Sequence, residues 1–129
     1  MKIKRYEDLE IWKLSTDTAI MIYKLTEKDR FAKDYGLRDQ IRRAAISISS
    51  NIVEGFEMNN NNDFIRYLRI AKGSTGETRS QLYVAHKLDY IQGGEYESVN
   101  ESLTTLSAKI GSLIKYLFNK KGDKEFTTR

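Results

Sequence analysis

Apolar residues recur at steps of three and four along four separate stretches of the chain, and this spacing places them on one side of an α-helix. In the last two stretches the steps alternate as heptads, which is typical of a helix bundle. The apolar positions are Leu9, Trp12, Ala19, Ile20 and Tyr23 in the first stretch, Leu37, Ile41, Ala44, Ala45, Ile48 and Ile52 in the second, Phe64, Leu68, Ala71, Leu82 and Ala85 in the third, and Val99, Leu103, Leu106, Ile110, Leu113 and Leu117 in the fourth. The pattern predicts helices over about residues 8–28, 37–57, 62–89 and 95–120, and a frayed tail at 121–129.

The predicted helices have similar lengths, about 30 to 40 Å at ~1.5 Å per residue, and short segments connect them. These two properties favour antiparallel packing of consecutive helices. We therefore expect one all-α domain over residues 1–129, an antiparallel up-down-up-down four-helix bundle.

Residues that favour helix ends mark the predicted boundaries. Asp8 can cap the first helix, and either Asn61 or Asn62 can cap the third, because these side chains accept hydrogen bonds from the free N–H groups of a first turn. Gly93 and Gly94 indicate a break before the fourth helix.

Two further features predict packing contacts. Phe31 and Tyr35 are the aromatic residues of the charged connection 27–36, and we expect them to hold it on the end of the bundle. Gly73 and Gly76 lie inside the third helix, where each costs about 1 kcal/mol in helix propensity. Close approach of a neighbouring backbone would explain these glycines.

The second predicted helix has more apolar and small residues than one core-facing side needs. Ile46 and Val53 lie beside its principal apolar stripe, together with Ser49 and Ser50. We expect this second stripe to face another copy of the chain, so the protein is predicted to form a homo-oligomer.

The composition agrees with a helical fold that needs no covalent cross-link. Among 129 residues there is no cysteine and no proline, 40% are hydrophobic and 31% are charged. Disulfides and thiolate metal sites are therefore excluded, and long uninterrupted helices are favoured. The first residues lack the apolar run of a signal peptide, and no stretch approaches the ~18 apolar residues of a membrane span. We expect a cytoplasmic protein that does not enter a membrane.

Motifs for the common cofactors and reactions of helical bundles are incomplete. A carboxylate-bridged di-iron site needs Glu-x-x-His on two helices, whereas this chain has one histidine, His86, with Tyr83 three residues before it. The serines of 47–50 have no base near them in the sequence, and the lysine of KGSTG at 72–76 precedes the glycines, unlike that of a phosphate-binding loop. We expect no metal, no cofactor and no enzymatic activity. The enzymatic alternative is a site built between subunits around Asn51 and Glu54.

Basic residues supply the remaining chemistry. The net charge is +4, and residues 65–129 hold eleven Lys and Arg against seven Asp and Glu, whereas residues 1–64 hold eleven of each. Arginine binds phosphate through paired hydrogen bonds. The residues predicted to bind nucleic acid are Arg38, Arg42 and Arg43 in the second helix and Arg66, Arg69, Lys72 and Arg79 in the third. The alternative is that the arginines of the second helix pair with acids such as Asp39 or Glu54.

Two segments of the chain resemble a known family. GLRDQIRRAAISISSNIVEG at 36–55 and DFIRYLRIAKGS at 63–74 are similar to the 23S rRNA intervening-sequence proteins, and weaker similarity extends from Leu9 through Tyr35 to Ile91. The resemblance implies a small antiparallel bundle that assembles into a ring-like homopentamer and is not an enzyme. A relative, the accessory variability protein of diversity-generating retroelements, works as a basic pentamer that binds nucleic acid and a reverse transcriptase.

The resemblance also implies which positions carry the family motif. They are Gly36, Leu37, Gln40, Arg42, Ser47, Asn51, Glu54, Gly55, Phe64, Leu68, Ala71, Gly73, Ser74 and Glu77. The residues expected at an oligomer interface or in this motif are Ile46, Ser47, Asn51, Val53, Glu54 and Gly55.

This chain departs from the family pattern at several positions. Ser49 stands where the family often has a proline, and Met58 with the asparagines stands near a common arginine, so that one phosphate contact is missing. Thr75 and Thr78 occupy positions where leucine is favoured, and we expect them to weaken the core near the middle of the bundle.

The sequence leaves two functions open. The first is a non-enzymatic homo-oligomeric bundle that binds structured RNA, or another nucleic acid, through a basic face. The second is an oligomeric scaffold for a protein partner, for example a reverse transcriptase, without direct binding of nucleic acid.

Overall fold

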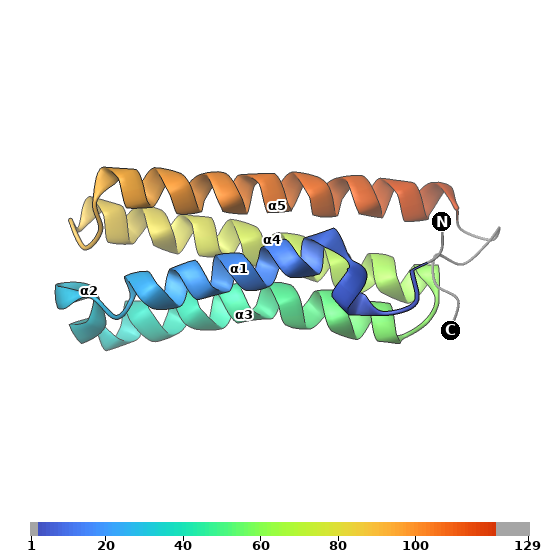
Figure 1. Cartoon of the computed structure of the whole chain (residues 1–129), viewed down its shortest axis with the longest axis horizontal. Helices are drawn as coiled ribbons and strands as arrows, with labels where there is room; N and C mark the ends of the chain where they lie inside the picture. Colours follow the sequence, from blue (N-terminus) through green and yellow to red (C-terminus); the bar gives the residue numbers. More distant parts are fainter. Residues whose placement is uncertain (1–2, 121–129) are drawn as a thin grey trace.

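The computed structural model describes residues 3–120 and contains four long helices with two short ones (Figure 1). The elements are η1 (Tyr6–Asp8), α1 (Glu10–Leu25), α2 (Asp29–Lys33), α3 (Tyr35–Glu57), α4 (Asn61–Lys87) and α5 (Gly93–Asn119). The tail predicted at 121–129 lies outside the described residues.

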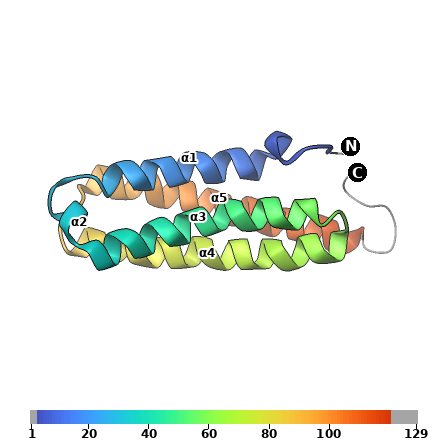
Figure 2. The same ribbon diagram turned by 90° about the horizontal axis from the view of Figure 1, so that it is seen from below.

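The four long helices run alternately in opposite directions along the bundle (Figure 1). Figure 2 shows α3 and α4 side by side over their length, and α3 also packs on α1, while α5 contacts both α4 and α1. Each long helix thus has two neighbours around one core. The predicted all-α up-down-up-down bundle is confirmed.

The core is built mainly from the predicted apolar positions. Fully buried large side chains come from every long helix, and they include Ile22, Ile41, Ile48, Ile52, Leu68, Leu82, Leu103, Leu106 and Ile110. Ile20 and Tyr23, predicted on the apolar stripe of the first helix, are instead 53% and 37% exposed. One part of the predicted stripe of α1 is therefore left on the surface.

Hydroxyl groups lie in the middle of this core. Thr75 and Thr78 are buried, and they donate to the backbone carbonyls of Lys72 at 2.6 Å and Ser74 at 2.7 Å. Since both hydroxyls have acceptors inside their own helix, their burial carries little of the cost of an unsatisfied polar group.

The helix ends differ from the predicted ones. Asp8 lies in η1 and does not cap α1, whose N-cap is Leu9 without a side-chain hydrogen bond. Asn60, rather than either asparagine after it, caps α4, because its Oδ1 accepts from the Asp63 N–H at 2.9 Å. The first helix ends at Leu25 instead of near residue 28, and the next helix, α2, begins at Asp29, whose φ is positive at 41°.

Two predicted packing contacts are wrong, and a different glycine makes a close approach. Phe31 is fully buried at the bundle end as expected, but Tyr35 is 65% exposed. Gly73 and Gly76 lie at the surface, where an added Cβ would meet no atom within 4 Å. At Gly55, by contrast, an added Cβ would lie 2.6 Å from the Cβ of Tyr67 (in α4), so glycine lets α3 and α4 approach at this point.

Candidate nucleic-acid interface

Arg42 is held against α1. Its Nε donates to the Thr26 hydroxyl at 2.7 Å, and its guanidinium carbon lies 4.5 Å from the centroid of the Tyr23 ring. The side chain therefore connects α3 to the end of α1. Pairing of Arg42 with Glu54, one of the predicted alternatives, is not the contact that forms.

The other two arginines of α3 also have partners in their own part of the chain. Arg38 donates to Asp39 at 2.8 Å and to the Ala32 carbonyl at 3.0 Å, so the predicted pairing with Asp39 is confirmed. The hydrogen bond from Arg38 lowers the pKa of Asp39. Arg43 is exposed and donates to Gln40 at 2.7 Å.

Two basic residues of α4 lean across onto α5. The Nζ of Lys72 donates to the Ser107 hydroxyl at 3.3 Å, and the Nε of Arg79 donates to the Asn100 amide oxygen at 3.4 Å. These are hydrogen bonds to neutral groups, so they position the two cations without neutralising them. The two sets of basic residues therefore lie on different edges of the bundle. The arginines of α3 lie on the edge next to α1 and α2, and the basic residues of α4 lie on the edge next to α5.

Arg66 lies at the start of the same edge. It donates to Asp63 at 3.2 Å and its guanidinium carbon lies 4.6 Å from the centroid of the Tyr67 ring. Hydrogen bonds from Asn60 and then Arg66 lower the pKa of Asp63, and the same contact with Asp63 raises the pKa of Arg66. Arg66 is thus oriented by an acid and a ring while more than half of its side chain, 57%, stays exposed.

A hollow of about 450 Å³ lies between the beginning of α4 and the end of α5. Its lining residues are Asn62, Ile65, Arg66, Arg69 and Phe118. Ile65 is 4% exposed, whereas Phe118 is 56% exposed and presents much of its ring to solvent. Within residues 3–120, no ion pair engages the guanidinium of Arg69.

We define the α4–α5 basic face as Arg66, Arg69, Lys72 and Arg79 of α4 together with Lys115 of α5. Lys115 is exposed and lies three residues before Phe118, so it shares the side of α5 that borders the hollow. Among the described residues, Arg66 is the only member of this face that forms an ion pair. The face therefore carries mostly uncompensated positive charge.

Three of the residues predicted for an interface or motif make contacts within one chain, two of them with α4 and one inside α3. The Ser47 and Ser74 hydroxyls are 3.0 Å apart, and the Asn51 amide donates to the Ser47 carbonyl at 2.8 Å. Gly55 makes the close approach to Tyr67 described above. Ser47, Asn51 and Gly55 thus have contacts within one chain.

The other three predicted interface residues face outward. Ile46 is 42% exposed, Glu54 is exposed and Val53 is half-buried. Ile46 also lines a hollow of about 420 Å³ between α1 and α3, which Ile20 and Tyr23 border from α1. This surface, the α1–α3 groove, is apolar for most of its lining.

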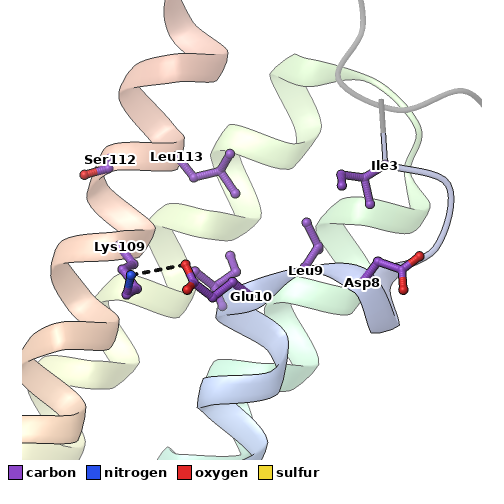
Figure 3. Close-up of a pocket in the computed structure, with 8 residues that line it drawn as sticks. Ile3, Asp8, Leu9, Glu10, Lys109, Ser112 and Leu113 are labelled. Carbon is purple, nitrogen blue, oxygen red and sulfur yellow. Dashed lines mark hydrogen bonds and ion pairs between the residues drawn. The ribbon is translucent and has the colours of Figure 1, made fainter. Parts of the chain in front are cut away.

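A second apolar hollow, of about 470 Å³, lies where the N-terminal segment meets α1 and α5. Figure 3 shows Ile3, Leu9 and Leu113 around it. A dashed line marks the contact between the Nζ of Lys109 and the Oε1 of Glu10, which are 3.1 Å apart. Because its one cation is paired with a carboxylate, this hollow suits an apolar group better than a phosphate.

The histidine lies outside any metal-binding cluster of the described residues, which contain no group of three or more potential protein ligands. His86 is half-buried and its ring stacks on Tyr96, with the centroids 4.3 Å apart. Within residues 3–120 no helix combines the length and the apolar character needed to cross a membrane.

The family model described as 23S rRNA-intervening sequence protein matches residues 7–112. The chain belongs to this family. A similar crystal structure is that of a protein of unknown function from the S23 ribosomal protein family of Bacteroides thetaiotaomicron. The two chains are 30% identical, the similarity covers 81% of this chain and 98% of the other, and the TM-score is 0.75. No functionally curated protein matches the chain.

The family model covers only some of the basic and aromatic residues at and near the hollow between α4 and α5. Arg66, Arg69 and Lys72 lie inside the part of this chain that matches the family model, whereas Lys115 and Phe118 follow it. Sequence reasoning missed these last two residues and Asn62. The heptad pattern of the fourth helix could have indicated them, because Phe118 directly follows the heptad position Leu117 and Lys115 lies midway between Leu113 and Leu117, so both are off the buried stripe.

Proposed function

We propose that this member of the 23S rRNA-intervening sequence family is a non-enzymatic homo-oligomeric bundle that binds structured RNA, or another nucleic acid, through its α4–α5 basic face. One observation carries the proposal. Four of the five cations of this face lack a carboxylate partner among the described residues, whereas Arg38 and Arg42 are held by contacts with neighbouring elements. Uncompensated cations aligned along one edge attract phosphate and release its counterions on binding.

The spacing along α4 supports binding of an extended anion. Arg66, Arg69 and Lys72 follow one another every three residues, about 4.5 Å along a helix axis at ~1.5 Å per residue. Each step also turns the side chain by about 60° around the helix, so the three cations span an arc of about 120°, and Lys115 adds a charge from α5. A polyanion lying along this edge contacts several cations at once.

Homo-oligomerisation is the second part of the proposal. Ile20, Tyr23 and Ile46 leave an apolar groove on one side of the chain, and Ile70 and Val84 of α4, with Leu88 at its C-cap, are 44% to 47% exposed. Covering these side chains with another copy removes apolar surface from water. A stoichiometry of five follows from the family resemblance, and a ring would present one basic face per copy, which strengthens binding through avidity.

Light scattering tests the oligomer. The wild-type protein is expected to have a mass that is a multiple of 15.0 kDa, and Ile46→Glu is expected to shift it toward 15.0 kDa. A wild-type mass of one chain at micromolar concentration contradicts this part of the proposal.

Filter binding with a labelled RNA hairpin tests the basic face. Arg69→Ala and Arg43→Ala remove the same charge from exposed positions on different helices, so they form a matched pair. Arg69→Ala should weaken binding several-fold at low salt, and Arg43→Ala should change it little. Absence of wild-type binding at low salt, or equal effects of the two variants, contradicts the proposal.

The alternative is a protein-interaction scaffold in which the apolar α1–α3 groove receives a partner such as a reverse transcriptase. The exposed Ile20 and Ile46 favour it as much as they favour a second copy. Affinity purification from the native host separates the two functions: a stoichiometric protein partner without RNA supports the scaffold.

A further inference from the structure

The hollow between α4 and α5 combines four kinds of surface in one place. Ile65 is buried and aliphatic, Phe118 supplies an exposed ring, Asn62 supplies an amide, and Arg66 and Arg69 supply guanidinium groups. No other hollow described above brings an aromatic ring together with two arginines. Its volume of about 450 Å³ also falls in the range of roughly 300 to 1,000 Å³ that small-molecule pockets occupy.

Each surface matches one part of a nucleotide. An exposed ring stacks on the face of a base, and every base has such a face. An amide offers both a donor and an acceptor, which is what the edge of a base requires. A guanidinium fork binds the phosphate oxygens.

The two arginines are prepared for this role in different ways. Arg66 is fixed by Asp63 and by the ring of Tyr67, so it loses little freedom on binding. Arg69 has no ion-pair partner in the part of the chain that the structure describes, so its full charge is available. Beyond them, Lys72 continues the line of cations away from the hollow.

The geometry points to a single-stranded nucleic acid as the ligand. We propose that one unstacked base enters the hollow and stacks on Phe118, while Arg66 and Arg69 bind the adjoining phosphates and Asn62 contacts the base edge. A base inside a duplex is covered on both faces by its neighbours and cannot reach the ring, so unpaired loops and ends are favoured. This inference rests on the proposed function and adds the strandedness of the ligand.

Fluorescence anisotropy with labelled oligonucleotides tests it. The probes are a mixed-sequence single-stranded RNA, a DNA strand of the same sequence, and the duplex of each. The variants are Phe118→Ala, Phe118→Tyr, Arg69→Ala and Tyr116→Ala, the last being a matched control because Tyr116 is 42% exposed on the same helix but does not line the hollow.

Phe118→Ala should weaken binding of single strands by about 5- to 100-fold, as expected for one lost stacking contact, and leave duplex binding unchanged. Phe118→Tyr should restore single-strand binding, and Tyr116→Ala should have little effect. If Phe118→Ala weakens binding of the RNA strand and the DNA strand equally, the protein recognises the base and the phosphate. If it weakens binding of RNA alone, the 2′-hydroxyl is also recognised.

If Phe118→Ala has no effect, or an equal effect on single strands and duplexes, the inference is overturned. The proposed function survives that result provided Arg69→Ala still weakens binding. If the wild-type protein binds none of the probes at low salt, the proposed function fails together with the inference.

Discussion

The Nε of Arg42 donates a hydrogen bond to the hydroxyl of Thr26 at 2.7 Å. The bond joins the first part of α3 to the residue that ends α1, and the Tyr23 ring lies under the same guanidinium. An arginine in this position stabilises the bundle, while an arginine such as Arg69 is available to a ligand.

Arg42→Ala should therefore lower stability and leave nucleic-acid binding nearly unchanged. The loss of a charged hydrogen bond and a cation–π contact predicts a decrease of about 1 to 2 kcal/mol in the free energy of unfolding. Arg42→Lys should recover only part of it, because an ammonium group cannot place one donor on Thr26 and a flat face on Tyr23. Urea denaturation measures the stability. If Arg42→Ala leaves the stability unchanged and weakens RNA binding, Arg42 is a ligand-binding residue and not a stabilising one.

Two glycines predict opposite effects of the same substitution. Gly55→Ala places a Cβ 2.6 Å from Tyr67 Cβ and 3.1 Å from Phe64 Cδ1, so α3 and α4 must separate, and we expect a loss of about 1 to 3 kcal/mol. Gly76→Ala adds a methyl group where nothing lies within 4 Å and should stabilise α4 by up to about 1 kcal/mol.

Thermal and urea denaturation of the two glycine variants, with each protein held in one oligomeric state, measure this difference. A destabilising Gly76→Ala would mean that a surface from outside the chain packs on this part of α4.

Acid should weaken the start of α5. The hydrogen bond from Lys28, followed by that from the Gln92 N–H, lowers the pKa of Glu95 below its ordinary value of 4.5. A carboxyl whose pKa is lower in the folded state stabilises the fold above its unfolded pKa, and this stabilisation disappears as the pH falls through the folded pKa. Glu95 thus contributes fully at neutral pH and progressively less below about pH 4.5.

Glu95→Gln should consequently flatten the decline in melting temperature between about pH 6 and pH 3. Glu97→Gln is the control, because Glu97 is exposed two residues further along the same helix. A wild-type and a Glu95→Gln protein with parallel pH profiles would exclude this contribution.

The heptads of the third and fourth stretches were sufficient to predict the bundle. Their spacing places residues such as Leu68, Leu82 and Leu106 on one side of each helix, and that side is buried. The helix ends were less predictable. The chain has four consecutive asparagines, Asn59 to Asn62, each of a residue type that can cap a helix, and the tertiary fold selects Asn60. Asp8 precedes a 3-10 turn, so its side chain is not at the first residue of α1.

The candidate site was predictable only in part. Spacing on α4 placed Arg66, Arg69 and Lys72 on a broad outward side, but periodicity does not say which helix lies next to that side. The role of Arg42 depends on Thr26, sixteen residues away, and the hollow depends on Phe118, about fifty residues from Arg69. Contacts of this kind require the tertiary fold.

The salt dependence of RNA binding tests the central claim most directly. The logarithm of the association constant should fall linearly with the logarithm of the salt concentration, with a slope of about −0.9 for each phosphate contact. We predict that Arg66→Ala combined with Arg69→Ala makes this slope shallower by about two, while Arg42→Ala combined with Arg43→Ala leaves it unchanged. A slope unchanged by the first pair, or made shallower by the second, would contradict the assignment of the α4–α5 basic face.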